Sequence, residues 1–402
     1  HIAIGKTPVT GVLPMAICAL QQGFDAIVLP RMNADEAAVV KGLKVIPAEN
    51  LSEVVSFLSG GIEIKSYSID IDSLFRYQGS QDIDFSDVKG QENVKRALEV
   101  AASGSHNCLI IGSPGSGKSM LAKRLPTILP EMTFEEALEV TKVHSIAGLL
   151  PHKTSLITKR PFRSPHHTIS VAGLIGGGKY PKPGEISLAH NGVLFLDEVT
   201  EFNSAVLEVL RQPLEDGVVH ISRLNAALTY PANITLICAA NPCKCGNLFE
   251  LEKECTCTPK QVEQYLGKLS GPLLDRIDIH IEVSSVKYSE LSEAKPGESS
   301  ALIRERVNRT RKIQAERYKN LGIYSNSQLS PSMLSKYCRL DYKCRAMLEE
   351  AFEKLNLSAR AYNRILKVAR TIADMEASPD IKPHHLAEAI QYRSLDRRFG
   401  KR

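Results

Sequence analysis

The spacing of hydrophobic positions divides the chain into an α/β part and an all-helical part. Short apolar runs alternate with helical spacing as far as residue 290, and from Ser299 onward the spacing is helical throughout. The apolar runs predict strands at 26–30, 44–46, 107–111, 193–197, 218–223, 233–239 and 278–283. Periodic apolar positions predict helices at 11–22, 34–40, 51–58, 299–319, 331–338, 342–355, 358–376 and 383–392. Because alternating strands and helices are typical of a sheet covered by helices, we expect an α/β fold.

The periodic pattern weakens after the first α/β segment. Residues 61–82 follow a Gly-Gly pair and show no sustained periodicity, which predicts a linker. We therefore expect an α/β domain at 1–60, a linker at 61–82, a second α/β domain at 83–290, a helical domain at 299–395 and a basic tail at 396–402. The chain begins with residues that resemble a strand, so we also expect further residues upstream.

Composition places the chain among globular proteins without a membrane segment. Its 402 residues predict two or three domains, and a hydrophobic content of 43% is typical of chains that form cores. The sequence contains no apolar run of about 18 residues, which is the length that a membrane helix needs. No signal peptide is visible in it. Because a nucleotide-binding loop, described below, is typical of cytosolic proteins, we expect a cytoplasmic protein without structural disulfides among its nine cysteines.

Charge is distributed unevenly along the chain. Residues 299–402 hold 22 Lys and Arg against 11 Asp and Glu, whereas the other 298 residues hold 28 against 34. This asymmetry favours a polyanionic partner for the C-terminal part. An arginine-rich helix face exposed to solvent would give the same composition, so charge alone leaves both interpretations open.

The segment 112–119, which we call the phosphate loop, carries the most specific chemical signal. Its members are Gly112, Ser113, Pro114, Gly115, Ser116, Gly117, Lys118 and Ser119. They fit the pattern G-x-x-x-x-G-K-[ST] and lie between an apolar strand and a helix, as the pattern requires. Lys118 would reach the β- and γ-phosphates, and the Ser119 hydroxyl would bind Mg²⁺. The sequence therefore predicts a site for a nucleoside triphosphate, with ATP and Mg²⁺ as ligands.

Polar residues follow two later strands at positions that suit this chemistry. Asp197 and Glu198 come directly after an apolar strand, where Asp197 would hold Mg²⁺ and Glu198 would polarise the attacking water. Asn241 ends another strand and would hold that water, although an asparagine that caps a strand is the alternative. Arg276 lies on a short turn before a strand, where it could stabilise a neighbouring subunit's phosphoryl group or form a surface ion pair.

Four of the cysteines form two close pairs, and we call them the cysteine cluster. Cys243 and Cys245 precede Cys255 and Cys257 by a short loop, a set that suits a tetrahedral zinc site. The spacing C-x-C is tighter than in common zinc motifs, and four free thiols are the alternative. Cys18, Cys108 and Cys238 lie in apolar strings and are expected to be core residues.

The order of these motifs resembles the AAA+ ATPases, and more narrowly the Mg-chelatase-like AAA+ proteins of the YifB/ComM group. The matching segments, which span most of the chain, are 88–92, 161–168, 184–192, 240–243, 270–278 and 357–362. The resemblance implies an AAA+ P-loop NTPase core, a parallel sheet flanked by helices, with a C-terminal helical lid. It implies that Asn241 is sensor 1, Arg276 the arginine finger and Arg360 the sensor 2 arginine. Residues 1–60 resemble part of a Lon-protease-like α/β domain.

The resemblance also implies a function, which is that of an ATP-dependent DNA motor. Such a protein forms a homo-oligomer, expected to be a hexameric ring, and moves single-stranded or branched DNA in recombination or natural transformation. Residues 161–192 and 214–232 resemble an insertion and a hairpin that face the ring pore. These segments would offer Lys179, Lys182, His220 and Arg223 to DNA, unless they are ordinary loop residues. A metal-chelatase subunit and a protein-remodelling ATPase are the alternatives.

Overall fold

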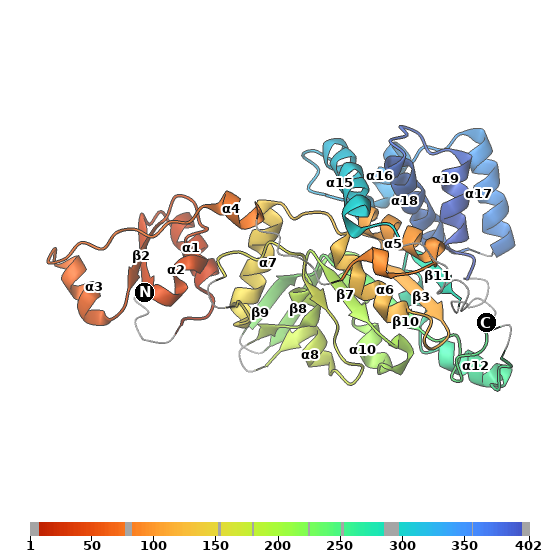
Figure 1. Ribbon diagram of the computed structural model, residues 1–402, viewed down its shortest axis with the longest axis horizontal. Coiled ribbons are helices and arrows are strands. Elements are labelled where there is room, and N and C mark those ends of the chain that lie inside the picture. Colours follow the sequence, from red (N-terminus) through yellow and green to blue (C-terminus); the bar gives the residue numbers. More distant parts are fainter. Residues whose placement is uncertain are drawn as a thin grey trace.

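The computed structural model describes residues 8–76, 83–151, 154–178, 181–223, 226–250, 253–284, 297–355 and 357–395. Lys179 and the basic tail at 396–402, both singled out by the sequence, lie outside these residues, and the side chain of Arg223 is not described. Figure 1 shows an N-terminal unit at one end, a central sheet with its helices, and a helical region beside that sheet. No helix of the described residues has the length and apolar character needed to cross a membrane.

The centre of the molecule is a five-stranded parallel sheet in the order β11-β3-β10-β7-β4. Its strands are β3 (Cys108–Gly112), β4 (Phe162–Arg163), β7 (Val193–Leu196), β10 (Thr235–Ala240) and β11 (Ile279–Val283). Four of them were predicted from apolar runs. The two-residue strand β4 was not, because it is too short to show a period. All strands run the same way, so the sheet has one amino edge and one carboxyl edge.

Alternate side chains of these strands enter two different cores. Cys108 and Ile110 of β3 belong to a core that includes two helices and most of the helical region, whereas Leu109 and Ile111 belong to the core on the opposite face. The helices of the first core are α5 (Glu92–Gly104) and α6 (Lys118–Arg124), and those of the second include α9 (Glu185–Leu188), α10 (Ser204–Glu208) and α13 (Gly271–Leu274). Burial on both faces explains why the strands are continuous apolar runs.

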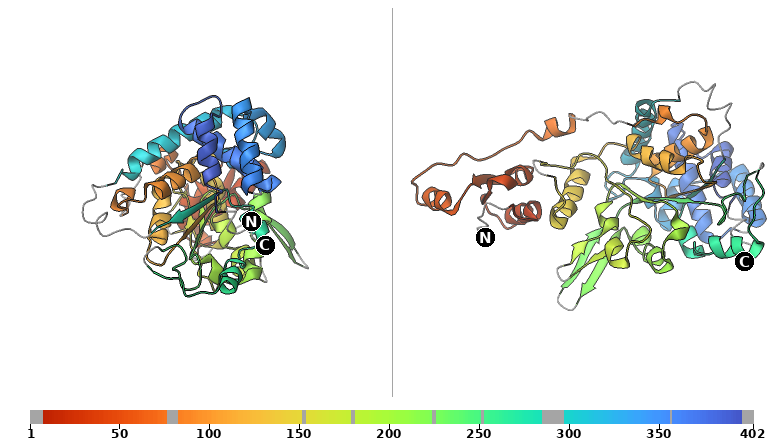
Figure 2. Two further views of the ribbon diagram at one scale, coloured as in Figure 1. Left: turned by 90° about the vertical axis from the view of Figure 1, so that its right-hand side faces the viewer. Right: turned by 60° about the horizontal axis from the view of Figure 1, so that its bottom comes forward.

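Two hairpins and a short helix lie on the second face, within the segments that resemble a pore insertion and a pore hairpin. They are β5 (Gly176–Gly177) with β6 (Lys182–Pro183), β8 (Val218–Arg223) with β9 (Ala226–Pro231), and α8 (Val171–Ile175). The pair β8–β9 extends away from the sheet (Figure 2). Its first strand was predicted at these residues, whereas β5 and β6 are too short for a pattern.

Among its described residues, the helical region contains five main helices. They are α15 (Ser300–Arg317), α16 (Pro331–Tyr337), α17 (Tyr342–Leu355), α18 (Ala359–Met375) and α19 (Pro383–Gln391). We call this region the lid. Pro331 and Pro383 each occupy a first helical position, where their missing N–H is not needed. The His280 amide of β11 donates to the Tyr392 carbonyl at 2.8 Å. The end of the lid is therefore joined directly to β11, the outermost strand on one side of the sheet.

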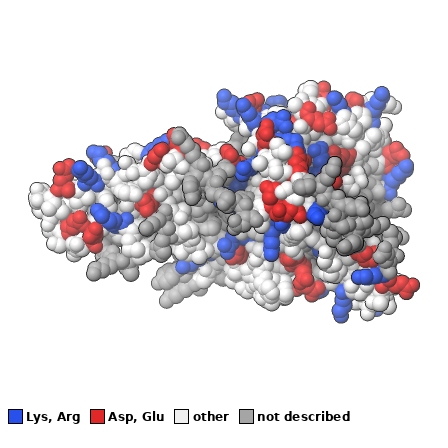
Figure 3. Space-filling model, in the orientation of Figure 1, with Lys and Arg blue, Asp and Glu red and all other residues white. Residues whose placement is uncertain are grey.

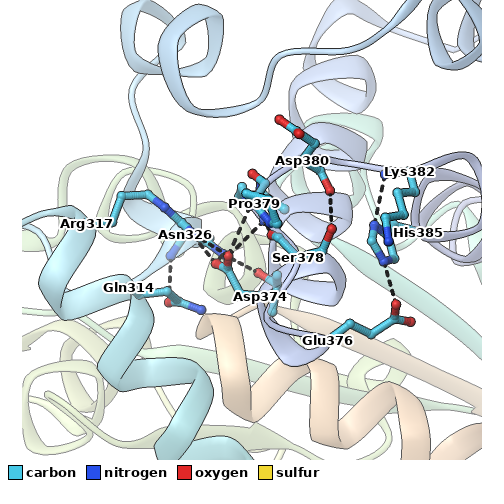
Figure 4. Close-up of polar contacts among 12 residues, drawn as sticks. Gln314, Arg317, Asn326, Asp374, Glu376, Ser378, Pro379, Asp380, Lys382 and His385 are labelled. Carbon is cyan, nitrogen blue, oxygen red and sulfur yellow. Dashed lines mark hydrogen bonds and ion pairs between the residues drawn. The ribbon is translucent and has the colours of Figure 1, made fainter.

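A buried carboxylate holds the lid helices together. Asp374 is 1% exposed and accepts hydrogen bonds from Arg317 at 2.7 Å, from Asn326 at 2.9 Å and from Arg370 at 3.1 Å (Figure 4). These donors come from α15, from the turn before α16 and from α18 itself. Because each donor would be costly to bury alone, the network fixes how these segments pack.

The N-terminal unit packs against the core through one long helix, α7 (Phe134–Ala147). The unit contains α1 (Val12–Gln21), β1 (Ala26–Pro30), α2 (Ala34–Ala37), β2 (Lys44–Ala48), α3 (Leu51–Leu58) and α4 (Ile71–Arg76). Strands β1 and β2 are parallel. The buried Glu36 carboxylate accepts from the Leu13 amide at 2.9 Å and from the Ser145 hydroxyl of α7. A shared apolar cluster of α1, α2 and α7 completes the contact.

The expected linker at 61–82 contains more order than its sequence predicts. The Tyr67 amide donates to the Val45 carbonyl at 2.8 Å, and the Tyr67 hydroxyl donates to Asp35 at 2.5 Å. Helix α4 follows within the same stretch. A single bridge and a six-residue helix are too short to show periodicity, so only the fold reveals them.

Candidate nucleotide-binding site

The phosphate loop joins the carboxyl end of β3 to the start of α6. Gly115 and Gly117 have φ angles of 77° and 88°, a left-handed backbone that side chains with a Cβ rarely adopt. The Gln91 side chain donates to the Ser116 carbonyl at 2.7 Å and holds the loop from outside. Gln91 lies in the matching segment 88–92, but no motif or spacing predicts this contact.

Lys118 is buried against the loop that precedes it. Its ammonium lies 2.7 Å from the Gly112 carbonyl, 2.8 Å from the Ser113 carbonyl and 3.2 Å from the Asn241 amide oxygen. Burial lowers the pKa of Lys118, while the nearby Asp197 and Glu198 carboxylates oppose that shift. The loop therefore presents one positive charge surrounded by carbonyl oxygens.

The predicted magnesium ligands lie next to each other. The Ser119 hydroxyl donates to an Asp197 carboxylate oxygen at 2.7 Å, and the other Asp197 oxygen accepts from the Glu198 amide at 3.0 Å. A hydroxyl and a carboxylate oxygen are ligands that Mg²⁺ prefers, so these residues fit the ion.

Glu198 has an unusual backbone conformation. Its φ of 50° and ψ of 48° lie in the left-handed region, which costs free energy for a residue with a side chain. Its side chain is exposed beside Asp197, in a position where it could act on a solvent molecule. Strain of this kind is concentrated at functional sites.

Sheet topology explains why these residues meet. Strands β3, β10 and β7 are adjacent and parallel, so the loop after β3, Asn241 after β10 and Asp197 after β7 share the carboxyl edge. Ligands of open α/β sheets bind outside this edge. The structure thus brings together every predicted residue of the site except two arginines.

Arg276 lies at the opposite, amino edge of the sheet. It comes just before β11, is 7% exposed, and donates to the Pro272 carbonyl at 2.8 Å and to the Glu215 carboxylate. The Asn107 side chain, just before β3, donates to the Arg276 carbonyl at 3.0 Å. Five residues of strand, about 16 Å, separate that level from Gly112, so Arg276 does not reach the phosphate loop of its own chain.

Arg360 also lies away from the phosphate loop. It is in the first turn of α18, its side chain is 58% exposed, and its guanidinium lies 3.9 Å from the Asp275 carboxylate. The Ser358 hydroxyl, which caps α18, also donates to Asp275 at 3.2 Å. Arg360 and Arg276 therefore flank the same turn at the amino edge, an arrangement that the sequence did not reveal.

The sulfur atoms of the cysteine cluster lie close together. The Cys243 sulfur is 3.4 Å from that of Cys245 and 3.6 Å from that of Cys255, and Cys257 completes a group within 4.8 Å. Hydrogen bonds from backbone amides lower the pKa of the Cys245 thiol to about 5, and the amide of Asn247 has the largest effect. A thiolate is the form that binds metals.

The remaining cysteines that the sequence assigned to the core behave differently from one another. Cys108 and Cys238 are buried in neighbouring strands, and burial raises the pKa of both thiols. Cys18 is exposed, so its assignment to the core was wrong. It lies on α1, where Leu13 and Ala16 supply the buried side.

The parallel sheet, the phosphate loop and the acidic residues at its carboxyl edge define a P-loop ATPase of the AAA+ class. Comparison with known families agrees. The profile described as "Magnesium chelatase, subunit ChlI" matches residues 84–291, and that of the ChlI C-terminal region matches residues 297–393. The chain therefore belongs to the Mg-chelatase-like AAA+ family, in the group of ComM and YifB.

Individual relatives support this assignment over nearly the whole chain. "Competence protein ComM" of Haemophilus influenzae is 44% identical over 98% of this chain and 76% of its own length. "Uncharacterized protein YifB" of Escherichia coli is 41% identical over 98% of this chain and 77% of its own. The "Magnesium-chelatase 38 kDa subunit" of Rhodobacter capsulatus is 25% identical over 51% of this chain and 57% of its own.

Proposed function

We propose that this protein is a cytoplasmic motor that hydrolyses ATP to move or remodel single-stranded or branched DNA. The observation that carries the ATPase part is the contact between Ser119 and Asp197, with Lys118 and Asn241 joined beside it. These four side chains come from three strands that meet only through the fold.

Each residue at the carboxyl edge has a distinct task in this proposal. The phosphate loop and Lys118 bind the triphosphate, while Ser119 and Asp197 hold Mg²⁺, which neutralises phosphate charge when it is bound. Glu198 accepts a proton from the attacking water, and Asn241 orients that water. To bind a triphosphate, Lys118 exchanges its contacts with loop carbonyls for phosphate oxygens.

Two arginines at the amino edge make the site depend on a second copy of the chain. Arg276 and Arg360 flank Asp275, about one strand length from the phosphate loop of their own chain. A closed ring, expected to be a hexamer, would place this edge against a neighbour's carboxyl edge. We therefore assign both arginines to the neighbour's γ-phosphate, and Arg276 must leave Glu215 to reach it.

The DNA part of the proposal is supported by the relative named as a competence protein and by exposed basic side chains. Lys182 and His220 are exposed on the two hairpins of the second face. Figure 3 shows Lys and Arg interspersed with Asp and Glu on one face. The exposed basic residues of the lid include Arg309, Lys312, Lys319, Lys336, Arg339, Lys343 and Arg345.

A second candidate is a chelatase-type or protein-remodelling ATPase subunit. The match to a magnesium-chelatase subunit over about half of this chain favours keeping it. Such a subunit would use the same nucleotide site, but its ATPase rate would respond to a protein partner rather than to DNA.

We also propose that the cysteine cluster binds one structural Zn²⁺. The sulfur atoms of Cys243, Cys245 and Cys255 are 3.4 to 3.6 Å apart, near the value of about 3.8 Å for a tetrahedron with Zn–S bonds of about 2.3 Å. Metal analysis of the purified chain tests this directly, and a protein with no zinc would overturn it.

The test of the motor proposal is the rate of ATP hydrolysis with and without forked DNA. We expect forked DNA to raise the rate several-fold at low salt, and we expect this stimulation to weaken as salt rises. Lys118→Ala should abolish the activity. Lys182→Ala, combined with His220→Ala, should retain the basal rate and lose much of the stimulation.

Two results would count against parts of the proposal. A basal ATPase with neither stimulation nor retention on DNA at low salt would favour the remodelling alternative. Absence of ATP binding by the wild-type chain would overturn the nucleotide site itself.

A further inference from the structure

We infer that the metal of the cysteine cluster braces the phosphate loop and thereby sets the affinity of the chain for ATP. This inference rests on the proposed ATPase and zinc sites, and it adds a physical connection between them. The connection consists of three contacts: one within the cysteine-bearing segment, one just before its first cysteine and one beyond its last cysteine.

The first contact is made by Gly246, directly after Cys245. Gly246 has a φ of 83°, and a Cβ built on it would lie 2.4 Å from the Pro114 Cδ atom. The backbone at Gly246 therefore packs directly on the phosphate loop, in a space that admits no side chain. A shift of this turn would move Pro114 as well, because the two residues pack together without a gap.

The second contact lies at the start of the segment. Asn241 precedes Cys243 by two residues, and its amide oxygen lies 3.2 Å from the Lys118 ammonium. Cys243 is fully buried, so the first ligand of the cluster is itself fixed in the core. The position of the lysine that contacts phosphate is thus tied to the position of the first metal ligand.

The third contact lies beyond the end of the segment. Helix α12 (Pro259–Leu266) begins two residues after Cys257, and its Tyr265 hydroxyl is hydrogen-bonded to the Thr200 hydroxyl at 2.6 Å. Thr200 belongs to the turn just after Glu198. The cluster therefore joins segments that contact the phosphate loop on one side and the turn just after the acidic pair on the other.

A metal ion is suited to this bracing role because the segment has little apolar core of its own. Helix α12 has no buried residue, and three of the four cysteines are only half-buried. Metal binding can supply the folding free energy that such a segment lacks. Without the ion, Gly246 and Asn241 would lose their fixed positions, and the phosphate loop would pay an ordering cost on binding ATP.

The first experiment removes and restores the metal in the wild-type 402-residue chain. Zinc is extracted with a thiol-compatible chelator, and ATP affinity is measured by calorimetry before extraction, after it, and after Zn²⁺ is added back. We expect the dissociation constant to rise roughly tenfold on extraction and to recover on addition. Circular dichroism at each stage checks that the fold is retained.

The second experiment separates the metal from the contact. Gly246→Ala keeps all four cysteines, so we expect full zinc content with ATP affinity lowered roughly tenfold. Gly322→Ala is the matched control, because Gly322 also has a positive φ of 68° but no atom lies within 4 Å of its Cβ position. Cys18→Ser controls for loss of an exposed thiol outside the cluster.

The possible results separate failure of the brace from failure of the proposed ATPase site or of the proposed zinc site. Zinc that is present and removable, with ATP affinity unchanged by extraction and by Gly246→Ala, would overturn the brace while leaving both sites intact. A wild-type chain that binds ATP but contains no zinc would overturn the metal site and the brace together. Loss of zinc in a Cys255→Ser, Cys257→Ser variant, together with weaker ATP binding, would support the brace.

Discussion

At the level of single residues, Asn107 shows how one side chain can position a distant functional group. Its amide oxygen accepts from the Leu236 amide at 2.8 Å, and its NH₂ group donates to the Arg276 carbonyl at 3.0 Å. Its own backbone amide donates to Asp278 at 2.9 Å. Asn107 therefore holds the turn that carries Arg276 against the amino ends of two strands, β10 and β11.

We predict that Asn107→Ala destabilises the core by about 2–3 kcal/mol, because it leaves the Leu236 N–H and the Arg276 carbonyl without a partner in a buried place. Urea denaturation followed by circular dichroism measures this change. The control is Asn203→Ala, which removes an exposed helix cap and should cost about 1 kcal/mol or less. Equal losses in the two variants would contradict the positioning role of Asn107.

At this level, the sequence allows a role to be predicted for residues inside motifs but not for the residues that support them. The phosphate loop, Asp197 and Asn241 could be found because spacing and strand ends mark them. Asn107, Gln91 and Glu215 have no such mark, since each contacts a partner far away in the sequence. Their roles depend on which strand ends share an edge of the sheet.

At the level of elements, the junction of α18 and α19 combines a carboxylate with two histidines. Glu376 accepts from His384 at 3.0 Å. It also accepts from His385 at 2.9 Å, and the His385 ring accepts from the Lys382 amide at 3.0 Å (Figure 4). The His384 and His385 hydrogen bonds hold the pKa of Glu376 at about 2, and burial lowers the pKa of His385.

Both pKa shifts predict that the junction of α18 and α19 contributes less to the free energy of unfolding at acid pH. The Glu376 carboxylate stabilises the fold above the unfolded pKa of about 4.3, and its contribution is lost as pH falls from there toward about 2. Protonation of His385 below about pH 6.5 favours unfolding too, because the charged ring cannot accept from Lys382. We expect Glu376→Gln to lower stability by up to about 1 kcal/mol near neutral pH, since Glu376 is largely exposed.

The measurement is thermal unfolding of the wild type and of Glu376→Gln across this pH range. The difference between them should shrink as pH falls from about 5 toward about 2. Glu350→Gln, which breaks the exposed pair with Lys354, is the control and should have little effect at any pH. A difference that stays constant with pH would contradict the assignment.

Length explains only part of which elements the sequence predicted: the 13-residue α5 and the 14-residue α7 received no predicted bounds, whereas the eight-residue α3 was predicted at its observed bounds. The long lid helices lie within a residue or two of their predicted bounds because their apolar stripes repeat many times. The two-residue strands β4, β5 and β6 and the short helix α4 were missed because they have no period to detect. Such elements form where neighbours offer hydrogen-bond partners, as β7 does for β4.

At the level of the whole molecule, several of the basic residues of the lid form ion pairs within the chain. Arg317 and Arg370 pair with the buried Asp374, Arg364 pairs with the buried Asp278, and Arg306 pairs with Glu99. These arginines serve packing rather than a polyanion. The excess charge that the sequence reveals is therefore only partly available to a polyanion.

The position of two arginines at the amino edge predicts complementation between subunits. Chains with Lys118→Ala and chains with Arg276→Ala should each be inactive in ATP hydrolysis. Mixed before assembly, they should recover about a quarter of the wild-type rate, because about a quarter of random interfaces pair an intact loop with an intact arginine.

The ATPase rate of the mixture, measured against each variant alone, checks this prediction. Arg360→Ala should complement Lys118→Ala in the same way, since Arg360 flanks the same turn as Arg276. It should fail to complement Arg276→Ala, because the two arginines belong to the same chain. Inactive mixtures, with assembly verified by gel filtration, would show that each chain works alone.

The sequence by itself determined which chemical groups are available to a candidate site. The phosphate loop, the acidic pair, the asparagine at a strand end and the paired cysteines follow one another along the chain, and each is local enough to be recognised from its own spacing. The tertiary structure alone decided which of these groups act together. It placed Lys118, Asp197 and Asn241 at one edge of the sheet, Arg276 and Arg360 at the other, and Gly246 against Pro114. The physical reason is that parallel strands place all their amino ends at one edge of the sheet and all their carboxyl ends at the other. No local sequence pattern shows which strands become neighbours.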